Sequence, residues 1–207
     1  MQPIRVGLLG VGTVGAGVFE VLARNGDEIE RRCGRRLTVV RASRRDVQAA
    51  QRVVGPNVAV SADPFEVVND PDIDVVVELI GGYTLAKDLV MRAIANGKHV
   101  VTANKALLAV HGAEIFEAAR QQSVVVAFEA AVAGGIPIIK TLREGLSANR
   151  VDWVAGIING TTNFIMSEMR SKGQSFEQVL QAAQALGYAE ADPTFDIEGV
   201  DAAHKLS

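Results

Sequence analysis

Short apolar segments rich in β-branched residues alternate with amphipathic segments over the first 130 residues of the chain. The apolar segments predict strands at Ile4–Leu9, Leu37–Ala42, Asp74–Leu79, His99–Thr102 and Val124–Phe128. The amphipathic segments predict helices at Thr13–Asn25, Leu85–Asn96 and Ala113–Gln122. Strands that are apolar on both faces are typical of a parallel sheet that helices cover on both sides. The pattern therefore predicts an α/β fold with a doubly wound parallel sheet.

The pattern changes after about residue 130, where small residues dominate Ala130–Pro137. The elements predicted beyond this loop are a long strand at Val151–Asn159 and helices at Phe164–Lys172 and Phe176–Leu186. Ser175 and Gln178 have the spacing of a capping box in front of the last helix. We therefore expect one domain at 1–130 and a second, of α+β type, at 131–207. Because the chain stops at Ser207 in what looks like a starting helix, we expect a fragment of a longer protein.

Composition excludes several classes of protein. Hydrophobic residues make up 48% of the chain and charged residues 22%, with a net charge of −3, which argues against a nucleic-acid or membrane-surface binder. The single cysteine, Cys33, cannot form an internal disulfide, and the three histidines are too widely spaced for a zinc site. The uncharged stretch Val6–Phe19 is too short to span a bilayer, so we expect no targeting segment and a cytoplasmic protein.

The first predicted strand runs directly into the motif G-x-G-x-x-G at residues 10–15. In such a turn Gly10 allows the sharp bend, Gly12 lets a pyrophosphate approach the backbone, and Gly15 allows close packing of helix on strand. The helix that begins there directs free N–H groups at the phosphates. The strand–turn–helix context favours a Rossmann-type dinucleotide site over the alternative that these glycines serve packing alone.

The end of the second predicted strand bears on the choice of cofactor. NAD-binding proteins usually carry an acid there for the ribose hydroxyls, but this strand is followed by Arg44 and Arg45, with no acid before Asp46. Residues 31–52 contain eight arginines and one acid. The outer arginines, at 31, 32, 35 and 36, could instead form a solvent-exposed surface with no role in binding phosphate. For Arg44 we favour a grip on a 2′-phosphate, which predicts NADP, with NAD as the alternative.

Two further features suggest chemistry. Lys105 follows the strand that ends at Thr102, and the carboxyl ends of parallel strands line the ligand crevice, although a solvated lysine is equally consistent. Asp201 and Lys205 are four positions apart and share one face of a helix. In a cleft they could exchange a proton with an alcohol or carbonyl oxygen, and on the surface they would be an ordinary ion pair. Spacing alone leaves both interpretations open.

Four motifs in order along the chain resemble the homoserine dehydrogenase family. They are V-T-A-N-K at 101–105, E-A-A-V-A-G-G-I-P at 129–137, I-I-N-G-T-T-N-F-I at 157–165 and G-Y-A-E-A-D-P-x-x-D-I-x-G-x-D-A-x-x-K at 187–205. The resemblance implies reversible reduction of aspartate 4-semialdehyde to homoserine with NAD(P)H, a homodimer, and a role for residues 131–207 as the start of the substrate-binding and dimerisation domain. It also implies that a complete member continues beyond Lys205.

The resemblance assigns roles to individual residues. Lys205 matches the proton donor, Asp201 the acid that binds substrate and supports this lysine, and Glu190 the acid that holds the substrate's ammonium group. Lys105 matches a lysine between nicotinamide and substrate. The nucleotide contacts that the resemblance implies are Thr13, Val14, Arg44 and Gly187. Glu129, with the carbonyl groups of Val132, Gly134 and Ile136, matches a sodium site, and these oxygen ligands suit a hard cation.

The sequence bears on three other functions. Oxidation of an aldehyde through a covalent thioester needs a cysteine in the cleft. Cys33 lies in the arginine-rich stretch before the second strand, far from the crevice loops, which argues against this function. A dinucleotide-sensing module without catalysis, and a dehydrogenase of a related amino alcohol, stay open because a fold alone does not fix a function.

Overall fold

The computed structural model describes residues 2–207. These residues form two compact units, one ending at Gly135 and the other running from Ile136 to Ser207. Each unit has a hydrophobic core of its own. In the described residues, no helix is both long and apolar enough to cross a bilayer.

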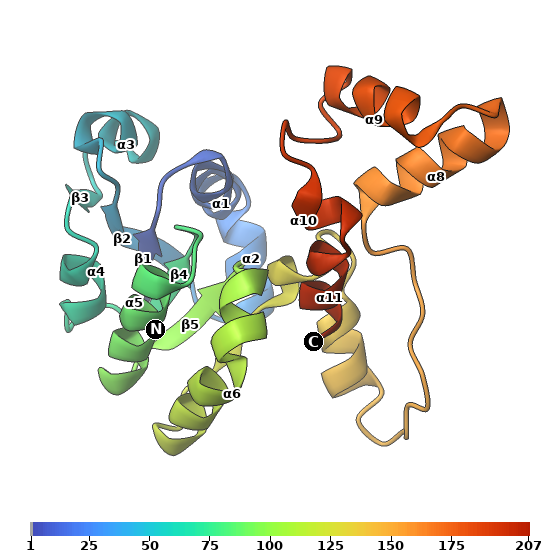
Figure 1. Cartoon of the computed structure of the whole chain (residues 1–207). Coiled ribbons are helices and arrows are strands. Elements are labelled where there is room, and N and C mark those ends of the chain that lie inside the picture. Colours follow the sequence, from blue (N-terminus) through green and yellow to red (C-terminus); the bar gives the residue numbers. More distant parts are fainter. Residues whose placement is uncertain (1) are drawn as a thin grey trace. The chain divides into compact units, whose positions relative to one another are not determined.

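The first unit is built on a sheet of six parallel strands in the order β3-β2-β1-β4-β5-β6 (Figure 1). The strands are β1 (Ile4–Leu9), β2 (Leu37–Ser43), β3 (Ala59–Ser61), β4 (Val75–Glu78), β5 (His99–Thr102) and β6 (Val126–Ala127). The strand order reverses between β1 and β4, which is the switch point where such sheets bind ligands. The predicted doubly wound fold is confirmed.

Helices cover both faces of this sheet. They are α1 (Thr13–Arg24), α2 (Gly26–Cys33), α3 (Val47–Val54), α4 (Phe65–Asn69), α5 (Thr84–Ala95) and α6 (Lys105–Gln121). Alternate strand residues face opposite layers: Leu9 and Val76 pack with α4, α5 and α6, whereas Leu8 and Val77 pack with α1 and α3. Both faces are therefore apolar, which explains why the strands read as continuous hydrophobic runs.

The structure corrects the predicted elements between the strands. The last helix of the sheet unit begins at Lys105, well before the predicted start at Ala113, because the Asn104 side chain accepts a hydrogen bond from the N–H of Leu107 and caps it. Elements α2, α3, β3 and α4 were not predicted. The cap of α3 is Asp46, whose carboxylate accepts from the N–H of Ala49.

The second unit is helical in its described residues. Its helices are α7 (Ile138–Lys140), the π-helical turn η2 (Thr141–Gly145), α8 (Gly160–Lys172), α9 (Phe176–Ala185), α10 (Thr194–Ile197) and α11 (Val200–Leu206). Ile165, Val179, Ala183 and Ala189 form its core. The capping box predicted from Ser175 and Gln178 is present in front of α9. The contacts of Ile165 with Val179 and Ala183 pack α8 against α9.

The predicted strand at Val151–Asn159 is wrong. Residues 151–159 form neither helix nor strand, and none of the six strands pairs with them. Trp153 and Ile157 are each 78% exposed. A strand needs a neighbour for its N–H and C=O groups, and an apolar β-branched sequence does not supply one by itself.

Candidate functional site

The turn between β1 and α1 leaves its backbone open on one side. Gly10 has a φ of +98°, and a Cβ on Gly15 would lie 2.1 Å from the carbonyl oxygen of Gly10. A Cβ on Gly12, by contrast, would have no atom within 4 Å. Thr13 and Val14 are exposed, and the first turn of α1 has no acidic side chain and no side-chain cap among the described residues. The turn therefore offers N–H groups and the positive end of a helix dipole to an anion.

Arg44 extends from the end of β2 to this turn. Its Nη1 donates to the carbonyl oxygen of Val11 at 2.6 Å, and the side chain is partly buried. The outer arginines behave differently: Arg31 and Arg32 both pair with Glu28 on their own helix. The count of one acid in residues 31–52 missed this compensation because the acids come just before that window. Arg44 is thus the arginine of this stretch that contacts the glycine turn.

A buried carboxylate ties together the loops that follow β4 and β5. Glu78 is fully buried; its Oε2 accepts from the Thr102 hydroxyl at 2.6 Å, and its Oε1 accepts from the N–H of Ile80 at 2.9 Å. Asn104 adds a second link by donating from Nδ2 to the carbonyl oxygen of Gly82. Sequence analysis missed Glu78, although an acid that ends a run of three valines was the available signal. The predicted site residue Lys105 is the first residue of α6, at this same edge, and is half-buried.

The loop predicted to hold sodium has an unusual backbone. Glu129 begins a short 3-10 turn, Val132 donates to its carbonyl oxygen, and Ala133 adopts a positive φ of 47°. Gly134 is exposed, and Ile136 belongs to the second unit. Among residues 2–207, no three His, Cys, Asp or Glu side chains are grouped closely enough to hold a metal. The predicted sodium ligands are mostly backbone carbonyl groups and therefore differ from such a cluster of side chains.

A pocket in the second unit contains the other predicted pair. It is lined by Asn159, Gly160, Thr161, Phe164, Gly187, Tyr188, Asp196, Asp201 and Lys205. Lys205 Nζ donates to Asp201 Oδ2 at 2.6 Å and to the carbonyl oxygen of Ile158 at 2.6 Å. The side chains of Asp201 and Lys205 are only 5% and 19% exposed. Of the two interpretations that spacing left open, the structure favours the cleft over the exposed ion pair.

Asn159 lies at the centre of this pocket's polar contacts. Its Nδ2 donates to Asp196 Oδ1 and to Asp201 Oδ2, each at 2.8 Å. Its Oδ1 accepts from the N–H and from the hydroxyl of Thr162, each at 2.8 Å. Sequence analysis did not single out Asn159, because Asn before Gly-Thr-Thr is also a common helix cap.

Two other predicted residues lie near the pocket. Gly187 lines it with a φ of +76°, and the Tyr188 that follows packs edge-on against Phe164. Glu190 is exposed and does not line the pocket, while its carbonyl oxygen accepts from Gln184 Nε2. The structure therefore brings Lys205, Asp201 and Gly187 together within the second unit, but not the Glu190 side chain.

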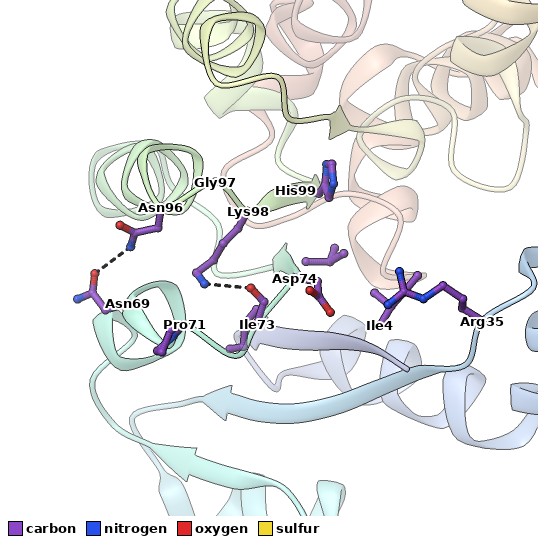
Figure 2. Close-up of a pocket in the computed structure, with 11 residues that line it drawn as sticks. Ile4, Arg35, Asn69, Pro71, Ile73, Asp74, Asn96, Gly97, Lys98 and His99 are labelled. Carbon is purple, nitrogen blue, oxygen red and sulfur yellow. Dashed lines mark hydrogen bonds between the residues drawn. The ribbon is translucent and has the colours of Figure 1, made fainter. Parts of the chain in front are cut away.

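A separate hollow lies at the opposite edge of the sheet, where the strands begin. Figure 2 shows Ile4, Asp74, Lys98 and His99 around it. Lys98 is 3% exposed and donates from Nζ to the carbonyl oxygen of Ile73 at 2.9 Å. Burial lowers the pKa of the Lys98 ammonium, and Asp70, Asp74 and Asp72 oppose this shift. Because α/β sheets bind their ligands at the carboxyl ends of the strands, we assign this edge a structural role.

Both parts of the chain match models of one protein family. The model described as "Homoserine dehydrogenase, NAD binding domain" matches residues 10–129, and "Homoserine dehydrogenase" matches residues 137–207. Homoserine dehydrogenase from Pseudomonas aeruginosa is 65% identical over 208 residues, covering 100% of this chain and 47% of that protein. The chain spans about half the length of the curated relatives it matches.

Solved structures give the same result. A homoserine dehydrogenase from Thiobacillus denitrificans is similar with a TM-score of 0.93 and 66% identity, covering 100% of this chain and 48% of that one. A hyperthermophilic archaeal homoserine dehydrogenase in complex with NADPH is similar with a TM-score of 0.84 and 26% identity, covering 99% of this chain and 67% of that one. The chain therefore belongs to the homoserine dehydrogenase family.

Proposed function

We propose that this chain carries the nucleotide-binding and proton-transfer parts of an NADP-dependent homoserine dehydrogenase. The reaction is homoserine + NADP⁺ ⇌ aspartate 4-semialdehyde + NADPH + H⁺. The observation that carries the proposal is the Lys205–Asp201 pair, which is mostly buried and lines a pocket in the unit that matches the catalytic family model. Membership of the family supports the same substrate pair.

Lys205 moves the proton in this proposal. During reduction its Nζ–H bond breaks as an O–H bond forms on the aldehyde oxygen, and during oxidation the neutral amine takes the proton back. A bound nicotinamide would supply the hydride for the carbon that bears this oxygen. Asp201 and the carbonyl oxygen of Ile158 fix the position of Nζ through the two 2.6 Å contacts.

Other residues bind and orient the substrate in the proposal. Its ammonium group needs carboxylates, and Glu190 and Asp201 are the ones that the family resemblance assigns. Lys105 would meet the substrate beside the nicotinamide. Because Glu190 is exposed and outside the pocket lining, its role rests on the resemblance and on no contact within the second unit.

We propose NADP over NAD on the position of Arg44. The guanidinium already reaches the glycine turn through Val11, where a 2′-phosphate would be the extra group of NADP. The relative that binds NADPH supports the choice. Arg44→Ala should weaken NADPH binding about 10- to 100-fold and NADH binding little, since a charge-assisted contact is worth roughly 1.5–3 kcal/mol. Arg31→Ala, on the ion-paired helix α2, is the control and should change neither affinity.

Sodium, a homodimer and a cytoplasmic location are further parts of the proposal. Oxygen ligands at Glu129, Val132, Gly134 and Ile136 would suit sodium, and comparing activity in sodium and potassium salts tests this. The exposed apolar side chains of Trp153 and Ile157 support a contact with a second copy, which light scattering tests. The exposed free thiol of Cys33 supports a reducing compartment.

The central experiment uses the protein expressed from its complete coding frame. Lys205→Ala should lower homoserine oxidation at least about 100-fold, because general acid–base groups contribute 10²–10⁴, and should leave NADPH binding intact. Lys172→Ala is the matched control, since Lys172 forms an exposed ion pair with Glu168 at the same i,i+4 spacing on α8. If Lys205→Ala turns over like the control, the proposed role of Lys205 is wrong.

A further inference from the structure

We propose that Asn159 is a positioning residue for proton transfer: its amide holds the Asp201 carboxylate that fixes Lys205. This inference rests on the proposed function and deepens it, because it assigns a task to a residue that family resemblance left without one. Asn159 is 8% exposed, and its contacts join α8, α10 and α11 within the second unit.

The orientation of the amide is fixed by its partners. Oδ1 receives two donors, the N–H and the hydroxyl of Thr162, so the NH₂ group must face the other way. It faces two carboxylates and gives one hydrogen to Asp196 and the other to Asp201. All four hydrogen-bonding positions of the amide are therefore used, and a flipped amide would set its oxygen against both carboxylates.

Adjacent residues of one segment hold both members of the ion pair. The carbonyl oxygen of Ile158 accepts from Lys205, and the amide of Asn159 donates to the oxygen of Asp201 that Lys205 also contacts. Two of the three N–H bonds of Lys205 are thus directed at the protein. The third remains for a substrate oxygen, so the position of Nζ depends on residues 158 and 159.

The charges around the pair make this arrangement sensitive. Asn159 contacts both Asp196 and Asp201, and Asp201 contacts Lys205, so two carboxylates accompany one ammonium group. Two other titratable side chains lie nearby. His204 packs edge-on against Phe195, and its buried Nδ1 has no partner within residues 2–207. Tyr188 lines the pocket. The neutral amide of Asn159 donates to both carboxylates and so lowers the repulsion between them. An aspartate at position 159 would instead add a third negative charge and raise this repulsion.

Asn159 is also the N-cap of α8, and this structural task must be separated from positioning. Capping uses only Oδ1, which accepts from the N–H of Thr162. Aspartate caps helices as well as asparagine does, so Asn159→Asp keeps the cap and removes the two donors. Ser175→Ala is the matched control: it removes the cap of α9 in the same unit, and none of its contacts involves the pocket.

The experiment measures homoserine oxidation against pH, NADPH affinity and melting temperature for the full-length protein. In Asn159→Asp we expect turnover to fall at least about tenfold, and the rising limb of the pH profile for oxidation to move to higher pH by roughly one unit, because added negative charge opposes loss of a proton from the pocket. NADPH affinity should not change. Ser175→Ala should lower the melting temperature and leave the pH profile as in the unaltered protein. Asn159→Ser, which keeps a cap and one donor, should lie between Asn159→Asp and the unaltered protein.

The possible results of this experiment distinguish the inference from the proposed function. A wild-type pH profile and turnover in Asn159→Asp would overturn the inference and leave the proposed function standing. Loss of folding in both Asn159 variants while Ser175→Ala folds would assign Asn159 a purely structural task and also overturn it. If the unaltered protein does not oxidise homoserine, the proposed function fails first and the inference fails with it.

Discussion

The two units of this chain build their candidate sites by different means. In the first, the backbone supplies the site: glycines at 10, 12 and 15 set a turn at the carboxyl end of β1, above buried clusters of fifteen and nine residues. In the second, side chains supply it: Asn159, Asp201 and Lys205 form a hydrogen-bonded set beside a cluster of four buried residues.

The two kinds of site tolerate different substitutions. A site made of backbone accepts many side chains nearby but fails when a Cβ enters the turn. A site made of side chains depends on the chemistry of each one, and its helices are held by few apolar contacts. Substitutions in the glycine turn, in the two cores and at single side chains test this difference.

The largest effect is expected at Gly15. In Gly15→Val the Cβ would lie 2.1 Å from the Gly10 carbonyl oxygen, so the free energy of unfolding should fall by about 5 kcal/mol or more. Gly12→Ala places a methyl group in open space, so stability should change by less than about 1 kcal/mol while NADPH affinity falls at least about tenfold. Thermal unfolding and titration of NADPH fluorescence measure the two. Equal loss of stability in both variants would contradict a site built on backbone approach.

The cores provide the next test. Leu89→Ala removes a fully buried side chain from the fifteen-residue cluster and should cost about 3 kcal/mol. Ile165→Ala changes the four-residue cluster and should cost about 2 kcal/mol, because α8 and α9 can close part of the cavity. Hydrogen exchange followed by mass spectrometry assigns each loss to β4 or to α9. A larger loss of stability at Ile165 than at Leu89 would contradict the expectation that the core of the first unit is the more sensitive to a cavity.

Sequence alone predicted the backbone-built site better than the side-chain-built one. Apolar runs locate β1, β2, β4 and β5 closely, because a parallel sheet covered on both faces favours apolar residues along its strands. The glycine motif then locates the turn. Glu78 and Asn159 were missed because their partners, Thr102 and Asp196, are far away in sequence. The strand at Val151–Asn159 failed for the same reason, since pairing depends on a distant segment and not on local composition.

Glu78 is an exception in the first unit, because here a side chain, and not the backbone, links the loops after β4 and β5. Glu78→Ala should lower the free energy of unfolding by roughly 1–3 kcal/mol, since the Thr102 hydroxyl and the N–H of Ile80 lose a buried acceptor. Glu78→Gln, which keeps one oxygen for the N–H groups, should cost less than about 1 kcal/mol. Denaturant titration measures both. A glutamine variant as unstable as the alanine variant would mean that the negative charge is required, and not an acceptor of the right shape.

The smallest effect concerns acid stability. Burial opposes ionisation of Asp70, but the N–H of Asp72 and the Arg41 guanidinium outweigh it and lower the pKa of the carboxyl group. A group whose folded-state pKa is depressed stabilises the protein above its unfolded-state pKa, and this stability is lost as the pH falls through the folded-state value.

In the second unit, hydrogen bonds from the hydroxyl and N–H of Thr194 lower the pKa of Asp192, which is fully exposed. Asp70→Asn should therefore flatten the fall in melting temperature below about pH 4 more than Asp192→Asn does, because the Arg41 contact is partly buried and less screened. Calorimetry from pH 7 to 3 at two salt concentrations measures this slope; a steeper change in Asp192→Asn would place the acid-sensitive contact in the second unit instead.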